Sequence, residues 1–302
     1  MLNFLRTMSI KNQIKTLSFF PLVFIIGMSF YIDMNLYNKQ SKLVDVKEII
    51  NLNEKISLLL HETQKERGIT SAFLGTKGAK FKDTLITQKE LTNKNIEEFK
   101  KTINKISVEK YPENGKNLID NVLKELSSIQ NIRSDVDSLA IDAKKAIAYY
   151  TDLNATLLSF VALTSTIADS ESTIKSIIAY YNFLMAKERA GIERAVGSNT
   201  FASKTFASGM FVKYLGLVNE QKIFFDAFFM YVGENKTFFN EKINHPVIQE
   251  VQKMRELLLS YGENKDVVLD IDSTIWFDKM TQKIDILKQI DDYLAKNLVI
   301  EI

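Results

Sequence analysis

The sequence predicts an all-α protein built from antiparallel helical bundles. Apolar residues from position 36 onward recur every three or four residues, with hardly any strict alternation of apolar and polar positions. Helix breakers are rare, since the 302 residues include only three prolines and eleven glycines. A run of uncharged, mostly apolar residues near the N-terminus adds a separate, membrane-type helix.

That run comprises the seventeen residues 16–32, close to the roughly 17–25 that cross a bilayer core. It predicts a leader at 1–15, a transmembrane helix at 16–33 and a helical domain at 34–302. A cleaved signal peptide is the alternative, because Arg6, Lys11 and Lys15 would supply its basic leader. No alanine precedes Ala72, which favours the anchor. Short leaders stay inside while long domains translocate, so residues after about 34 are expected outside the cytoplasm.

Two long apolar seams define the body of the chain. One position of the first seam has no apolar residue and is occupied by Arg133. Trp276 precedes the second seam. The seams are Ile119, Val122, Leu126, Ile129, Val136 and Leu139, then Met280, Ile284, Leu287, Ile290, Leu294 and Leu298. Breaks are predicted at 75–78, 111–115, 197–205, 233–235, 245–246 and 262–265.

These helices are too many for a single four-helix bundle, so two bundles are expected. One would use about 34–150 with the C-terminal helix, and the other about 151–262, with the first and last helices running through both. Trp276 and an aromatic stripe are expected to pack in the core. The stripe is Phe224, Phe225, Phe228, Phe229, Phe238 and Phe239.

Composition excludes several classes of function. The formal charge of +2 provides no global field for a nucleic-acid backbone, so no nucleic-acid partner is expected. The chain has no cysteine and only two histidines, which removes disulfides, thiol nucleophiles and Cys-containing zinc sites. No nucleophile–base set or phosphate-binding glycine loop stands out. We therefore expect a binding protein without a metal or cofactor rather than an enzyme.

Two segments combine arginines with small residues. Helical spacing places Gln64, Thr70 and Ser71 beside Arg67, which gives one face a guanidinium, an amide and two hydroxyls. In the second segment, Ala190 and Gly191 precede Arg194 by one turn. A guanidinium presents several donors in one plane, which suits a flat oxyanion such as nitrate, nitrite or a carboxylate.

The same segments also allow a purely structural interpretation, in which the arginines bind no ligand. Arg67 would then pair with a glutamate on another helix, and Gly191 would only permit close helix packing. Arg189 and Glu193 would form a surface i,i+4 pair that stabilises the helix by about 0.3–0.5 kcal/mol.

Taken together, the segments resemble the nitrate- and nitrite-sensing domain family. The resemblance rests on Gln64-x-Glu66-Arg67-Gly68 and Lys187-Glu188-x-Ala190-Gly191-x-Glu193-Arg194-Ala195, and extends over about 45–295 through segments at 219–221, 251–255 and 276–285. It implies an all-helical sensor of two packed four-helix bundles, found outside the cytoplasm in bacterial chemoreceptors and sensor kinases. It further implies a single-pass inner-membrane protein with a periplasmic sensor domain, which we expect to form a homodimer.

By motif position, the resemblance implies that Arg67, Arg194 and Arg255 contact the anion, supported by Gln64, Thr70, Ser71 and Glu193. A member of the family has two adjacent arginines in the first motif where this chain has Glu66-Arg67, so one cation is absent. Clustered buried guanidiniums repel one another unless an anion is present. Our hypothesis is that Glu66 or Glu193 neutralises part of the cluster, and that the anion displaces or supplements this carboxylate.

The leading expectation is thus a membrane-anchored nitrate or nitrite sensor that passes a conformational signal to a chemotaxis or other output. No kinase, cyclase or methyl-accepting pattern follows Leu298, so the signal is expected to reach a further segment or a partner protein. Two alternatives are a helical sensor for another small anion, such as a carboxylate, and an anchored helical interaction protein without a ligand.

Overall fold

The computed structural model describes residues 9–106, 113–166, 168 and 170–300. The regular secondary structure of these residues consists of helices. The expected all-α class is confirmed. The chain divides into two compact units after Lys47. This boundary lies further along the chain than the predicted one at residue 34.

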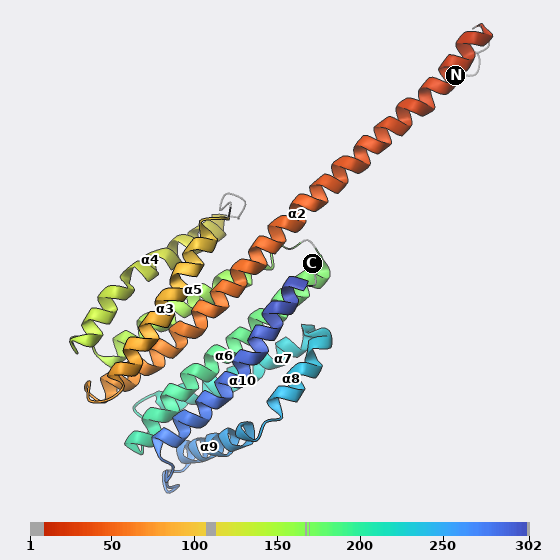
Figure 1. Ribbon diagram of the computed structural model, residues 1–302. Helices are drawn as coiled ribbons and strands as arrows, with labels where there is room; N and C mark the ends of the chain where they lie inside the picture. The colour runs from red at the N-terminus through yellow and green to blue at the C-terminus, as the bar shows by residue number, and fades with distance from the viewer. Residues whose placement is uncertain (1–8, 107–112, 167, 169, 301–302) are drawn as a thin grey trace. The chain divides into compact units, whose positions relative to one another are not determined.

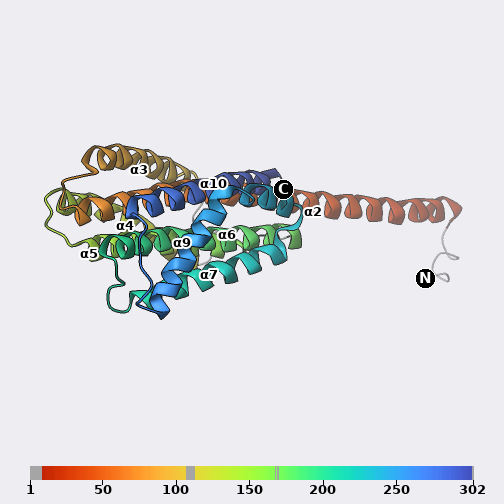
Figure 2. The ribbon, with the colours of Figure 1, turned by 90° about the horizontal axis from the view of Figure 1, so that it is seen from below.

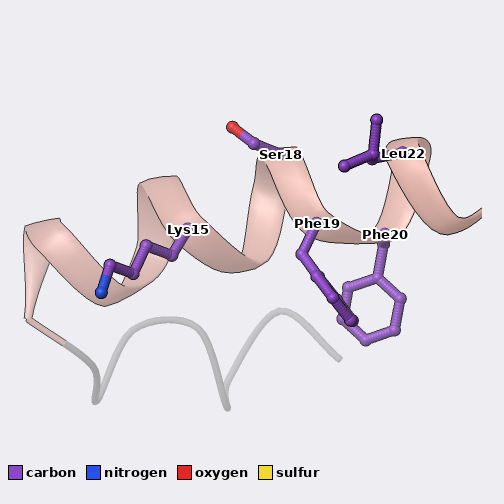
Figure 3. A pocket seen from close by; sticks show the side chains of 5 residues that line it. All are labelled: Lys15, Ser18, Phe19, Phe20 and Leu22. Carbon is purple, nitrogen blue, oxygen red and sulfur yellow. The ribbon is translucent and has the colours of Figure 1, made fainter.

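The first unit consists of the N-terminal part of α2 (Ile10–Gly75). Its apolar side chains are exposed, and Figure 3 shows Phe19, Phe20 and Leu22 projecting from the helix, with Lys15 one turn earlier. The stretch Ser18–Tyr37 is long and apolar enough to cross a membrane. α5 (Ala143–Thr164) is also long and apolar enough to cross a membrane, although nearly half of that helix is buried within the protein. Length and composition alone therefore do not separate a span from a core helix.

The second unit begins with a bundle formed by the remainder of α2 with α3, α4 and α5 (Figure 1). α3 (Lys82–Ile103), α4 (Glu113–Asp137) and α5 each turn an apolar stripe inward. The first seam is buried from Ile119 to Val136. Leu139 is exposed, because α4 ends at Asp137 and Leu139 follows it with a positive φ of 57°.

The second bundle of this unit contains α6 (Glu171–Ser203), α7 (Met210–Tyr231), α9 (Pro246–Glu263) and α10 (Ser273–Ile300). The short helices η2 (Gly233–Asn235) and α8 (Lys236–Ile243) connect α7 to α9. The second predicted seam, Met280 to Leu298, is buried along α10. Figure 2 shows α6 and α7 running beside each other, and the two helices contact each other extensively.

The predicted division of the chain between the bundles was wrong. The C-terminal helix α10 packs on α6, α8 and α9, and α5 packs on α4, so α5 completes the first bundle and α10 completes the second. The expected break at 197–205 is confirmed only at its end, because α6 continues past Gly197 to Ser203 before the turn that precedes α7. Gly197 instead provides space for Trp276, whose ring a Cβ at this position would overlap.

The aromatic stripe packs in the core only in part, since Phe228 and Phe239 are buried and its other four phenylalanines are half-buried. Phe183 on α6 meets Phe225 and Phe228 on α7 and Phe239 on α8 with ring centroids 5.4–6.3 Å apart. Trp276 is fully buried, and its indole nitrogen donates a hydrogen bond to the carbonyl oxygen of Arg194 at 2.9 Å. This bond fixes the start of α10 against the middle of α6.

Candidate functional site

The two predicted arginine segments meet where α2 crosses α6. Arg67 on α2 lies against Gly191 on α6, where a Cβ would stand 3.2 Å from the Nη2 atom of the arginine. Arg194 on α6 lies against Gly68 on α2, where the corresponding distance is 2.8 Å. Each helix therefore places a guanidinium over the glycine of the other, and both arginine side chains are buried.

Arg67 is paired with a carboxylate from the opposite helix. Its Nη1 and Nη2 atoms donate to the two oxygens of Glu188 at 2.5 and 3.2 Å. Gln64 donates to the same carboxylate at 2.7 Å, and Thr151 accepts from Arg67 at 3.2 Å. The structural interpretation of Arg67, a pair with a glutamate on another helix, is thus correct for this state of the protein.

Arg194 is placed differently, because no carboxylate among the described residues lies within ion-pair distance of it. Its Nη1 donates to the hydroxyl of Thr281 at 2.9 Å, and its guanidinium lies 4.8 Å from the ring centre of Phe277. Burial and, to a lesser extent, the charge of Arg67 lower the pKa of Arg194 to about 10, against a weaker raising effect of Asp285. The cluster therefore carries positive charge that is incompletely neutralised.

Arg194 lines a cleft of about 420 Å³ that also borders Gly68 and Ser71. The cleft lies among the end of α2, the C-terminal part of α6 and the start of α10, and Lys80 and Asp278 contribute charged groups to its wall. Its size falls within the range of roughly 300–1,000 Å³ that is typical of ligand pockets. One of the two arginines therefore lines a ligand-sized space.

The other predicted site residues divide between the cluster and the bundle interiors. Gln64 belongs to the cluster through Glu188, and Ser71 belongs to the cleft. Thr70 is fully buried, and its hydroxyl has no hydrogen-bond partner among the described residues. Arg255 and Glu193 lie together in the second bundle, and the contacts of Arg255 are with that bundle rather than with Arg67 or Arg194.

Glu193 is held tightly in this position. Arg255 donates from Nε and Nη2 to its two oxygens at 2.7 and 2.8 Å, and Gln221 and Tyr214 donate to it as well. Burial by itself would raise the pKa of Glu193, but the charges of Arg255 and Lys283 outweigh burial and lower the pKa to about 2. The predicted surface pair of Arg189 with Glu193 is wrong, since Arg189 pairs with Glu220 and Glu193 is buried.

The first bundle repeats this arrangement around Glu66. Arg133 donates from Nε and Nη2 to the two oxygens of Glu66 at 2.7 and 2.8 Å, and Tyr150 donates at 2.7 Å. Glu66 directly precedes Arg67 in the sequence, and Glu193 directly precedes Arg194. Each bundle thus holds a glutamate on its own arginine and presents the next residue, an arginine, to the other bundle.

Glu188 and Arg133 are site residues whose pairing was not predicted from the sequence. Arg133 interrupts an otherwise apolar seam, and a single charge at a seam position indicates a buried partner. Glu188 lies in the Lys187-Glu188 pair on a face that is otherwise apolar, with Leu184 and Gly191 one turn away on either side. In both cases the signal was a charge on the buried side of an amphipathic helix.

Comparison with known proteins identifies the family of this chain. The family model described as nitrate and nitrite sensing matches residues 58–299. A nitrate regulatory protein of Klebsiella oxytoca is 23% identical over 176 residues, which are 58% of this chain and 43% of that protein. The chain thus matches less than half the length of this curated relative.

The structure of the NasR transcription antiterminator resembles the fold with a TM-score of 0.78. That match covers 90% of this chain and 73% of the other, at 20% identity, so it is evidence for the fold alone. The family model spans both bundles and both arginine segments. The chain therefore belongs to the nitrate- and nitrite-sensing family.

Proposed function

We propose that this protein detects nitrate or nitrite by direct contact of the anion with Arg67 and Arg194. The observation that carries the proposal is their reciprocal placement, each guanidinium buried against a glycine of the other helix. The glycines leave the donors of both arginines close to the helix crossing, where one small ligand could reach both. Family membership supplies the identity of the anion.

Charge and shape both suit such a ligand. Nitrate and nitrite are planar and monovalent, and they offer oxygen pairs that match the donor fork of a guanidinium. A buried cation without a carboxylate is unfavourable unless an anion neutralises it. Arg194 is such a cation among the described residues, and it borders the cleft.

Arg255 has a supporting role in this proposal. Its donors are engaged with Glu193, Gln221 and Gln252. We infer that Arg255 keeps Glu193 in the second bundle and so prevents that carboxylate from pairing with Arg194, the next residue. Arg133 would have the same role toward Glu66 and Arg67.

Calorimetric titration of the full chain in detergent tests the proposal. Nitrate, nitrite and acetate would be titrated at constant ionic strength into the wild type, Arg67→Lys and Arg194→Lys. Lysine retains the charge but lacks the planar donor fork, so we expect at least a tenfold loss of nitrate or nitrite affinity in each variant. Arg189→Lys is the matched control, because this arginine lies on the same helix but pairs with Glu220 at the surface.

Preferential binding of acetate would redirect the proposal to a carboxylate sensor. Binding of none of these anions would favour a ligand-free helical protein whose arginines only hold helices together. Equal affinities for the wild type and both lysine variants would place the anion elsewhere in the molecule.

We further propose that Ser18–Tyr37 anchors the protein in the bacterial inner membrane, with the sensor unit in the periplasm. The exposed apolar surface of this helix supports the anchor. The absence of cysteine allows a direct test, since Ser9→Cys and Ser128→Cys would each create a single exposed thiol. An impermeant maleimide should label position 128 but not position 9 in spheroplasts, and the opposite result would reverse the orientation.

The proposed output is a signal that passes from the sensor unit along α2 to a chemotaxis or other transduction module. α2 is the segment that joins the two units in sequence, so it is the direct covalent route. A homodimer in the membrane is part of this proposal. Light scattering of the full chain in detergent, with and without nitrate, would give its mass, and a monomer in both conditions would contradict the dimer.

A further inference from the structure

Glu188 presents Arg67 with the same chemical group that the proposed ligand would present. The two carboxylate oxygens lie 2.5 and 3.2 Å from the terminal nitrogens of Arg67, so the pair is bidentate. Both side chains are buried, and Gln64 adds a third hydrogen bond to the carboxylate. A carboxylate and a nitrite or nitrate ion are all planar and monovalent, and each can place two oxygens before a guanidinium.

We propose that Glu188 is an internal competitor, an oxyanion of the protein itself that occupies Arg67 until nitrate or nitrite displaces it. This inference rests on the function proposed above for Arg67 and Arg194. It adds the residue that sets the affinity of the site. Binding of the external anion is then an exchange of one anion for another at Arg67.

The two glutamates that directly precede the arginines are not available for this role. Glu66, which precedes Arg67, accepts from Arg133 and Tyr150 in the first bundle. Glu193, which precedes Arg194, is held by Arg255 in the second. The hypothesis that Glu66 or Glu193 neutralises the cluster is therefore replaced by one in which Glu188 does so.

The asymmetry between the arginines suggests an order of events. Arg194 borders the cleft and makes no ion pair with a carboxylate of the described residues, whereas Glu188 occupies Arg67. An anion entering from the cleft would meet Arg194 first and then compete with Glu188 for Arg67. Release of Glu188 would remove the ion pair that ties α2 to α6 and would free the helix crossing to shift.

The test is calorimetric titration of nitrate and nitrite into the full chain in detergent, using the wild type, Glu188→Gln and Glu188→Asp. Glutamine removes the competing charge but retains the length of the side chain, so we expect at least tenfold tighter binding. Aspartate retains the charge but shortens the reach to Arg67, so we expect a smaller increase. Glu220→Gln is the matched control, because it removes a carboxylate paired with another arginine of α6 and should leave the affinity unchanged.

Melting temperatures provide the second measurement. Without anion, Glu188→Gln should melt below the wild type, since Arg67 is then buried without its ion-pair partner. Saturating nitrate should raise the melting temperature of this variant more than that of the wild type. If Glu188→Gln does not fold, Glu188→Asp decides the question by its affinity alone.

Unchanged or weaker binding by the Glu188 variants, with a wild type that binds, would overturn the competitor role and leave the proposed function intact. Tight binding by Glu188→Gln and none by the wild type would support the competitor role in a stronger form. Failure of the wild type and of both variants to bind either anion would overturn the proposed function itself.

Discussion

Gly68 on α2 lies so close to Arg194 on α6 that a single methyl group would reach the guanidinium. A Cβ at Gly68 would stand 2.8 Å from Nη2 and 3.6 Å from Cζ of the arginine. The atom it meets is the far end of a flexible side chain rather than backbone. Gly68 thus leaves room for the guanidinium of Arg194. It has less effect on the distance between α2 and α6.

Gly68→Ala should therefore lower anion affinity without unfolding the protein. Alanine favours the helix by up to about 1 kcal/mol relative to glycine, which offsets part of the displacement of Arg194. We expect at least a tenfold loss of nitrate or nitrite affinity and a melting temperature within a few degrees of the wild type. Gly216→Ala is the matched control, since no described residue lies within 4 Å of a Cβ placed there, and a loss of affinity in this control would contradict the prediction.

Gly197→Ala should act on stability instead. A Cβ there would overlap the rigid indole of Trp276, which is fully buried and bonded to the backbone of Arg194. Overpacking of this kind costs about 1–3 kcal/mol. The loss should appear in urea unfolding followed by the fluorescence of Trp276, the only tryptophan of the chain. A variant as stable as the wild type would show that α10 can shift away from α6 at no cost.

Glu193 should make the protein sensitive to acid. Its pKa is lowered from 4.5 to about 2, so the unfolded chain binds a proton at a higher pH than the native protein does. This stabilisation, on the order of 3 kcal/mol, is fully present above about pH 4.5 and is lost as the pH falls toward 2. Glu193→Gln should destabilise the protein at pH 7 and flatten the dependence of the unfolding free energy between pH 4.5 and 2. Parallel curves for the two proteins would contradict the assignment.

Lys187 and Asp291 should be strongly coupled. Their side chains are fully buried and 2.6 Å apart, and Ser57 and Tyr180 also donate to Asp291. Asp291→Asn should cost about 3–5 kcal/mol because it leaves the lysine charge buried without a partner. The double variant Lys187→Met/Asp291→Leu should lose less than the sum of Lys187→Met and Asp291→Leu measured singly. Additive losses in urea unfolding would show that the pair is not coupled.

Helical periodicity predicted much of the fold. The seam from Met280 to Leu298 is buried throughout, and turns occur as expected after Gly75 and at Gly233. The end of α4 at Asp137 was missed, since the apolar spacing continues through Leu139. Helical periodicity could not assign α10 to a bundle, because the seam shows that one face of this helix is buried but not which helices cover that face.

The sequence alone determined that the chain forms amphipathic helices, that its arginines lie in two small-residue segments, and that these segments resemble one family. Only the tertiary structure decided that Arg67 pairs with Glu188, 121 residues away, while Glu66 and Glu193 pair within their own bundles. The physical reason is that periodicity is a local property of each helix. Pairing between helices depends on their relative rotation and axial position, which the packing of large groups such as Trp276 into Gly197 fixes.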